Sequence, residues 1–171
     1  MIEKLLTIED GTYSWTYENF VAHTHHEGGR IVWAKASGLQ NHYEGLPAIL
    51  RIVSNPEVAC NPITKPGDLQ QNIEGDWDLV KREILRQMDL SRKFHARKSK
   101  LENLWVKVLD IPSDLEPGPA KDLLLSIPQK TFPVKNLTMY APEFALWLLT
   151  DLEMRNVVKI FEPVRISTKK E

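Results

Sequence analysis

The sequence predicts an α+β fold in a single domain, residues 1–171. Three observations favour it. Near the N-terminus, apolar and polar residues alternate between glycine-containing turns; residues 76–109 contain no proline or glycine; and proline-rich segments lie on both sides of that stretch. Hydrophobic residues make up 42% of the chain and charged residues 26%, which is ordinary for a globular protein. A chain of this length can bury a core without disulfides.

Residues 1–55 are expected to be mainly β and to form an antiparallel meander. Asp10-Gly11 and Gly28-Gly29 are dipeptides that tolerate positive φ and are typical of hairpin turns. We expect a strand on each side of both turns, and a further strand at 49–54. A helix at 17–27 is the alternative, because apolar residues there also follow helical spacing and the glycine pair could end it.

Residues 56–75 contain three prolines and a polar run, and these features predict a connector. Residues 76–109 then predict one long central helix, or two helices with a tight joint. Apolar residues follow helical spacing at both ends of this stretch, but not in its middle. We therefore expect a solvated middle or a break near Ser91. An uninterrupted helix would be about 50 Å long, so a neighbour is expected to cover part of it.

Residues 110–171 are expected to be mixed. Prolines interrupt the first part, and short extended segments are expected at 123–127 and 131–134. Pro142 suits the first turn of a C-terminal helix at 142–155, and Asn156 can end that helix in the left-handed conformation. A strand, bent at Pro163, is expected at 157–166.

The chain has a single cysteine, Cys60, which cannot form an internal disulfide and suits a reducing compartment. The N-terminus does not resemble a signal peptide, and no apolar run approaches the length that spans a bilayer. We expect a cytoplasmic protein that does not enter a membrane.

A histidine cluster at residues 23–27 is the one local group of potential metal ligands. In a strand His23 and His25 share a face; in a helix His23, His26 and Glu27 do. Two imidazoles could bind zinc, with His42 as the best distant candidate for a third ligand. The order of residues matches no established zinc-enzyme motif. A polar strand end beside the glycine turn is the competing interpretation.

A basic run lies within the predicted long helix. Residues 81–100 include eight lysines and arginines and only two acidic residues. A helix carrying this charge would attract phosphates or an acidic protein surface. The run has no recognised nucleic-acid-binding motif, so a merely solvated face is the alternative. The candidate binding residues are Arg92, Lys93, Arg97, Lys98 and Lys100.

No catalytic motif stands out. The chain lacks a nucleophile elbow and a Walker loop, and Cys60 has no base beside it in sequence. The leading hypothesis is a non-enzymatic interaction or structural protein, a subunit of a larger assembly, with a protein partner or self-association. The alternatives are a nucleic-acid-associated accessory protein that uses residues 81–100, and a metal-dependent enzyme that uses residues 23–27.

Overall fold

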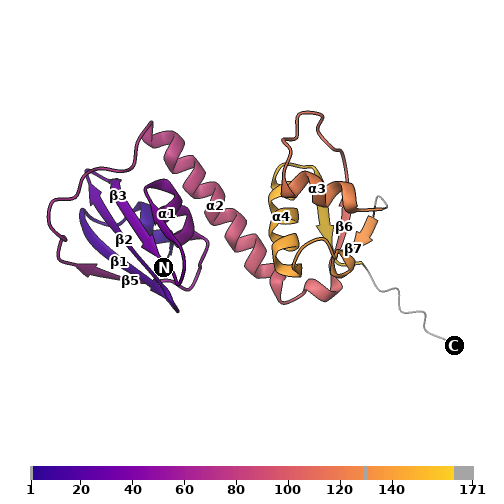
Figure 1. Cartoon of the computed structure of the whole chain (residues 1–171), viewed down its shortest axis with the longest axis horizontal. Coiled ribbons are helices and arrows are strands. Elements are labelled where there is room, and N and C mark those ends of the chain that lie inside the picture. Colours follow the sequence, from indigo (N-terminus) through magenta and orange to yellow (C-terminus); the bar gives the residue numbers. More distant parts are fainter. Residues whose placement is uncertain (1, 129–130, 164–171) are drawn as a thin grey trace. The chain divides into compact units, whose positions relative to one another are not determined.

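The computed structural model describes residues 2–128 and 131–163. Antiparallel sheets and helices confirm the α+β class with an N-terminal meander (Figure 1). The sequence predicted one domain, and the chain folds into two compact units, residues 1–91 and 92–171. Helix α2 (Trp77–Lys98) contributes residues to both units.

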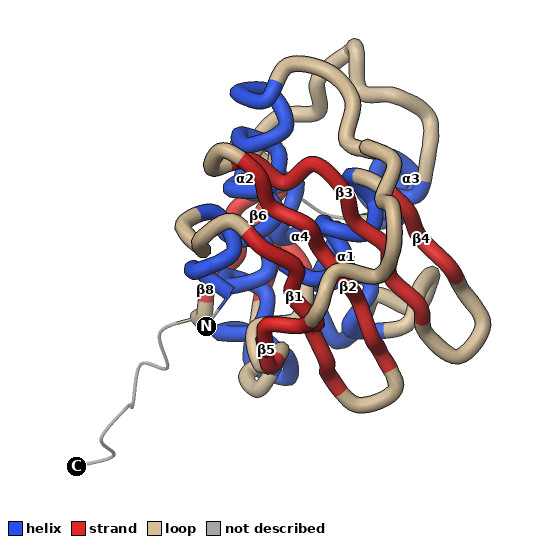
Figure 2. Tube along the Cα trace, turned by 90° about the vertical axis from the view of Figure 1, so that its left-hand side faces the viewer, coloured by secondary structure: helices blue, strands red, loops and turns tan. Residues whose placement is uncertain are grey.

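Unit 1 is built on a five-stranded antiparallel sheet in the order β4-β3-β2-β1-β5. The first four strands are consecutive neighbours, so the predicted meander is confirmed, and Figure 2 shows β3, β2 and β1 side by side. The fifth strand pairs with the free edge of β1. The strands are β1 (Gly11–Tyr17), β2 (Phe20–Glu27), β3 (Arg30–Ser37), β4 (His42–Glu44) and β5 (Ala59–Ile63).

The glycine pair forms the β2–β3 turn, as expected. Gly28 and Gly29 have φ values of 59° and 70°, which a residue with a side chain adopts only at a cost. Because residues 20–27 form β2, the helical alternative for 17–27 is wrong.

The predicted hairpin at Asp10-Gly11 is wrong. The residues before it form a short 3₁₀ helix, η1 (Ile2–Leu6), and Gly11 is already the first residue of β1. The Asp10 carboxylate instead accepts hydrogen bonds from the backbone N–H groups of Gly28 and Gly29, at 2.8 and 3.2 Å. This aspartate therefore stabilises a turn that is distant in sequence.

Residues 49–54 do not form the expected strand. They belong to helix α1 (Leu46–Val53), which begins with Pro47 near its first position. Its buried residues face the sheet at helical spacing: Ala48, Ile49, Ile52 and Val53. We call the side of the sheet that α1 covers the inner face, and the opposite side the outer face.

A β-bulge sets which side chains of β3 are buried. His25 pairs with Trp33 but His26 pairs with Ile31, so Val32 is one extra residue in β3. As a result Ile31 and Ala34 are both buried on the inner face. The core of unit 1 combines this face with α1 and with Val80 and Ile84 from the first half of α2.

The long central helix is confirmed, but its predicted extent of 76–109 is wrong. Helix α2 ends at Lys98 and is followed by a 3₁₀ turn, η2 (Leu101–Asn103), and by strand β6 (Trp105–Val108). Residues 105–108 pair with strands on both sides, and those pairings override their helical spacing. The expected solvated middle is also wrong, since Leu90, Ser91 and Phe94 are buried.

Unit 2 contains a three-stranded antiparallel sheet in the order β7-β6-β8. Strand β7 (Thr131–Pro133) continues into a 3₁₀ turn, η3 (Val134–Asn136). Residues 123–127 are not extended as expected, because helix α3 spans Pro119–Ser126.

The C-terminal helix and strand are confirmed. Helix α4 spans Pro142–Met154, and Asn156 has φ 60°, the predicted left-handed stop. Strand β8 spans Val158–Phe161; residues 164–166 of the predicted strand lie outside the described residues. Helices α3 and α4 pack on one face of this sheet and form the core of unit 2 with it.

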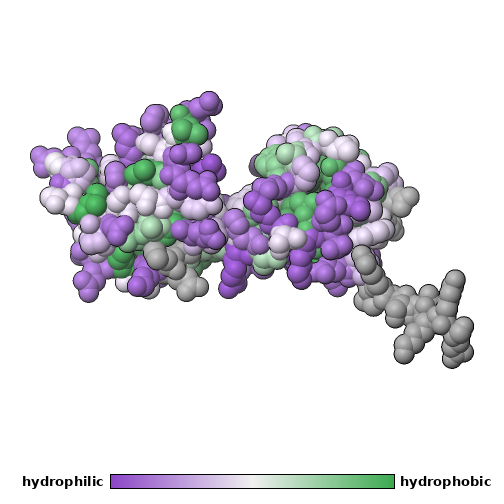
Figure 3. All heavy atoms as spheres, turned by 90° about the horizontal axis from the view of Figure 1, so that it is seen from below, coloured by the Kyte–Doolittle hydropathy of each residue, from purple (hydrophilic) through white to green (hydrophobic). Residues whose placement is uncertain are grey.

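The surface shown in Figure 3 is mostly hydrophilic, with smaller hydrophobic areas between hydrophilic side chains. No helix among the described residues combines the length and the apolar character needed to cross a bilayer.

Candidate functional site

The structure places the predicted basic residues beside acidic side chains of their own unit. Within unit 2, Arg97 lies 2.6 Å from Glu153, and Lys98 lies 3.0 Å from Glu143. Lys100 donates a hydrogen bond of 2.9 Å to Glu162. These glutamates are distant in sequence, so the sequence analysis could not place them. Three of the five candidate cations therefore have carboxylate partners within the chain.

The other candidates in the basic run are also not freely available. Arg92 and Lys93 both interact with further groups of the chain. Phe94, which could have stacked on a nucleic-acid base, is buried and packs edge to face on Trp147, with ring centroids 5.1 Å apart. The positive helix surface expected from the sequence is therefore largely occupied by the protein itself.

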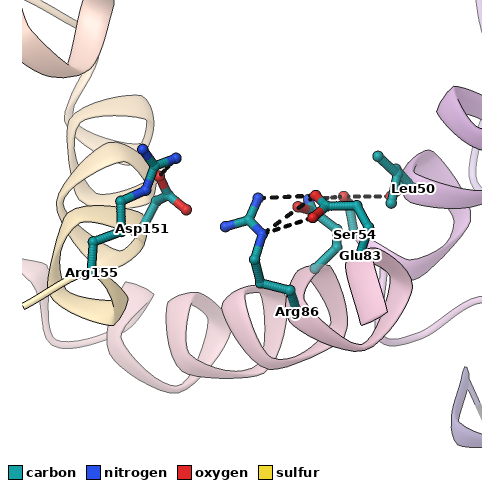
Figure 4. Close-up of polar contacts among 7 residues, drawn as sticks. Leu50, Ser54, Glu83, Arg86, Asp151 and Arg155 are labelled. Atoms are coloured by element: carbon teal, nitrogen blue, oxygen red, sulfur yellow. Dashed lines mark hydrogen bonds and ion pairs between the residues drawn. The ribbon is translucent and has the colours of Figure 1, made fainter. Parts of the chain in front are cut away.

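Two other arginines, Arg86 on α2 and Arg155 at the end of α4, form ion pairs with acidic residues three or four positions earlier in the chain. Arg86 donates from Nε and Nη2 to the carboxylate of Glu83, with contacts of 3.1 Å (Figure 4). The same figure shows Arg155 beside Asp151, one turn earlier on α4, with 2.8 Å between the groups. Such partly exposed pairs at helical spacing stabilise a helix only slightly.

The histidine cluster is divided between the two faces of the sheet. Side chains alternate along β2, so His26 points to the inner face while His23 and His25 point to the outer face. Within residues 2–128 and 131–163, no three His, Cys, Asp or Glu side chains are arranged to hold a metal ion. The geometry therefore gives the zinc hypothesis no ligand set.

His26 belongs to a buried hydrogen-bonded chain. The Trp15 indole N–H donates to Thr24 Oγ1 at 2.9 Å, and Thr24 Oγ1 lies 2.9 Å from His26 Nε2. Because an indole N–H can only donate, the Thr24 hydroxyl accepts from Trp15 and is free to donate to His26. Burial lowers the pKa of His26 to about 4; positive charge on His25 acts in the same direction and Asp10 opposes it.

His25 links a hydroxyl to a carboxylate on the outer face. Its Nδ1 lies 2.8 Å from Thr12 Oγ1, and its Nε2 lies 2.8 Å from Glu27 Oε1. An ionised carboxylate can only accept, so Nε2 carries a hydrogen; in the neutral imidazole this leaves Nδ1 to accept from the Thr12 hydroxyl. The sequence analysis missed this arrangement, although Thr12 faces His25 in the strand register.

A hydroxyl, an imidazole and a carboxylate in one chain are the elements of a nucleophilic site. The surroundings of Thr12 lack two further requirements of such a site, namely access for a substrate and an oxyanion hole. Thr12 is buried, at 5% exposure, and its strand is paired on both sides, so the nearby backbone N–H groups are committed to the two ladders. They cannot act as an oxyanion hole. We interpret the Thr12–His25–Glu27 chain as structural.

Cys60 lies in edge strand β5 and is half-buried. Burial raises the pKa of its thiol, and the charge of Lys4 only partly opposes this. A raised pKa disfavours the thiolate, which is the nucleophilic form of cysteine.

One open hollow of 440 Å³ lies in unit 1 between the β1–β2 turn, the segment joining β3 to β4 and α1. Arg51 and Glu18 are its charged lining residues, and the Arg51 guanidinium lies 5.9 Å from the centre of the Tyr43 ring. Apart from Gly38 and Leu39, the other lining residues are polar or aromatic, and the hollow brings no nucleophile beside a base.

Unit 2 displays apolar side chains around a second hollow. Leu125 is 67% exposed, Met139 49% and Phe144 44%. Tyr140 packs edge to face on Phe144, with ring centroids 5.3 Å apart, and shares the hollow with Leu125 and Met139. We call these four residues, Leu125, Met139, Tyr140 and Phe144, the apolar cluster.

Comparison with known proteins finds no protein-family model, no curated protein and no solved structure that matches the chain.

Proposed function

We propose that this chain is a non-enzymatic interaction protein that acts as a subunit of a larger assembly. The observation that carries the proposal is the apolar cluster. Its members come from α3, from the segment before α4 and from the first turn of α4. Contiguous exposed apolar side chains with polar neighbours are typical of protein-binding surfaces.

The residues of the apolar cluster are not core residues that happen to be incompletely buried. Leu123 and Leu124, immediately before Leu125, are almost fully buried, so α3 already provides its share of the packing. Leu125 points away from that core. Covering a leucine and a phenylalanine of this exposure would remove apolar surface from water, each at a gain of about 1 kcal/mol or more.

The charged rim of the cluster suggests how a partner would be oriented. Asp122 lines the same hollow, and Glu143 lies next to Phe144 in sequence but is paired with Lys98. A partner with an apolar centre and a basic edge would fit this arrangement, because charges at the rim guide orientation more than they add affinity.

The double variant Leu125→Asp/Phe144→Asp tests the proposal, with Leu79→Asp as the control because Leu79 is 56% exposed on α2, outside the cluster. Sedimentation velocity would detect self-association, and affinity purification from the source cells would detect another protein. We expect the wild type and the control to keep the same partner and the double variant to lose it, with affinity at least about tenfold weaker. A wild-type monomer whose co-purifying proteins are unchanged in the double variant would contradict the proposal.

A further inference from the structure

The sheet of unit 2 has one face that α3 and α4 do not cover. Side chains alternate along β6, so Val106 is buried toward the helices and Trp105 and Lys107 point the other way. The strand register places side chains from β7 and β8 beside them. We call this side the open face; it carries Trp105, Lys107, Thr131, Pro133, Lys159 and Phe161.

Two aromatic residues occupy paired positions on the open face. Trp105 and Phe161 are directly opposite in the β6–β8 register, so their Cβ atoms are roughly 5 Å apart. Both side chains are half-buried, and neither belongs to the hydrophobic core of unit 2. The open face therefore carries two aromatic side chains at paired positions that the core does not use.

The next row of the open face carries two lysines. Lys107 and Lys159 are paired in the register and both are exposed. Like charges in this position repel each other, and among the described residues no carboxylate lies within ion-pair distance of either. An anion placed between them would relieve the repulsion.

A hollow of 560 Å³ continues the open face beside Trp105 and Pro133. It adds a further cation, Lys135, and two acids, Glu102 and Glu162. Glu162 is engaged by Lys100 at 2.9 Å. The balance of charge around the two rings is therefore positive.

We propose that the open face binds single-stranded nucleic acid. Two successive bases stack on Trp105 and Phe161, and Lys107 and Lys159 contact the phosphates. Aromatic side chains on neighbouring strands of a sheet are well suited to unstacked bases, and stacking tolerates any base because each has a π-face. A duplex would keep its bases stacked and leave the rings without partners.

This inference goes beyond the proposed function, because it uses another surface and another class of partner. It also differs from the basic-run hypothesis: Lys98 and Lys100 have carboxylate partners, whereas Lys107 and Lys159 are cations beside available rings. The two hypotheses predict different losses of binding on substitution.

The test is fluorescence anisotropy with the full chain and labelled single-stranded RNA and DNA of about ten nucleotides. A duplex of the same length and an acidic peptide serve as competitors. We expect the single strands to bind, with log Kd changing with log salt at a slope of roughly 1.4, as expected for two phosphates contacted. We expect neither competitor to displace them at equal concentration.

Two sets of variants separate stacking from charge. Trp105→Leu and Phe161→Leu keep apolar bulk but remove the ring, and each should weaken binding by roughly 5- to 100-fold, as loss of one stacked base does. Lys107→Gln/Lys159→Gln should weaken binding and flatten the salt dependence. The ring variants and the lysine variant perturb the sheet differently. If one set fails to fold, the other set still tests the proposal.

The control variants make the same kinds of substitution at positions outside the open face. Phe144→Leu removes an exposed ring of the apolar cluster, and Lys93→Gln/Lys98→Gln removes two charges of the basic run; both should bind like the wild type. Circular dichroism checks that every variant is folded. Unchanged binding in folded Trp105→Leu and Lys107→Gln/Lys159→Gln, preference for the duplex or the peptide, or no binding to single strands would overturn the proposal.

Discussion

The Arg97 guanidinium lies 2.6 Å from the Glu153 carboxylate and links the last turn of α2 to α4 within unit 2. The other oxygen of Glu153 accepts a hydrogen bond of 2.8 Å from the backbone N–H of Ile160 in edge strand β8. One carboxylate thus neutralises a cation of the basic run and accepts a hydrogen bond from a backbone N–H at the edge of the sheet. Without that acceptor, the N–H at the edge would be available to pair with a strand of another molecule.

Glu153→Ala should lower the free energy of unfolding by about 2 kcal/mol, because it leaves the Arg97 charge without its ion-pair partner and the Ile160 N–H without its acceptor. Glu153→Gln should cost less, since its amide oxygen can still accept one hydrogen bond. Urea unfolding of these variants, of Arg97→Met and of the double variant Arg97→Met/Glu153→Ala would measure the coupling, which we expect at about 1 kcal/mol. Additive effects would show that the two groups do not interact in solution.

Acidification should destabilise unit 1 through His26. Its pKa is about 4 in the folded chain and 6.5 when unperturbed, so between these values the unfolded chain binds the additional proton. The free energy of unfolding should therefore be unaffected above about pH 6.5, fall as the pH drops below it and reach its full loss, about 3 kcal/mol, below about pH 4.

His26→Gln removes the titrating group and keeps an acceptor for the Thr24 hydroxyl. Urea midpoints measured across this pH range should vary less for His26→Gln than for the wild type. His23→Gln, on the outer face of the same strand, is the control and should keep the wild-type dependence. A wild-type profile in His26→Gln would assign the acid sensitivity to other groups.

Two buried threonines should differ in how much their hydrogen bonds contribute to stability. Thr24→Val leaves both the Trp15 N–H and His26 Nε2 without their partner, so we expect a loss of about 3 kcal/mol in the free energy of unfolding. Thr12→Val affects only His25 and should cost about 1 kcal/mol. Thermal or urea unfolding would compare them, and equal losses would contradict the proposed chain of hydrogen bonds.

Gly45 is a position where a side chain should not be tolerated. It has φ 63°, and a Cβ there would lie 2.5 Å from the backbone oxygen of Asn72. Gly67 has nearly the same φ, 61°, but open space around it, and is the matched control. We expect Gly67→Ala to cost about 1 kcal/mol for the left-handed conformation alone.

Gly45→Ala should cost at least about 2 kcal/mol, because its ψ of −143° lies in a region almost restricted to glycine and steric overlap with backbone adds to that cost. The difference between the two variants in urea unfolding measures these two effects together. If both variants lost equal stability, the connector near Asn72 would not pack against Gly45 as described.

The sequence predicted local structure well where one residue type sets the backbone. The Gly28-Gly29 turn, the start of α4 at Pro142 and the stop at Asn156 all follow from φ preferences that do not depend on distant residues. The strand pattern around Gly28-Gly29 also yielded the meander. These features were open to prediction because each is determined within a few residues.

Prediction failed where a short apolar segment could serve as helix or strand. Residues 49–54 became the end of α1 and residues 105–108 became β6, the reverse of both expectations. Periodicity over so few residues does not distinguish the two. Pairing with β7 and β8 decided the outcome for residues 105–108, and packing of an apolar face on the sheet decided it for residues 49–54; both involve residues distant in sequence.

The candidate sites show the same division. The sequence alone shows that residues 81–100 are basic and that residues 23–27 are rich in histidine, because the residue types of a segment can be read directly from it. Only the tertiary structure placed Glu143, Glu153 and Glu162 beside the basic residues and brought Trp105 opposite Phe161. Charge neutralisation and strand pairing act through space, so residues distant in sequence decided which side chains remain available to a partner.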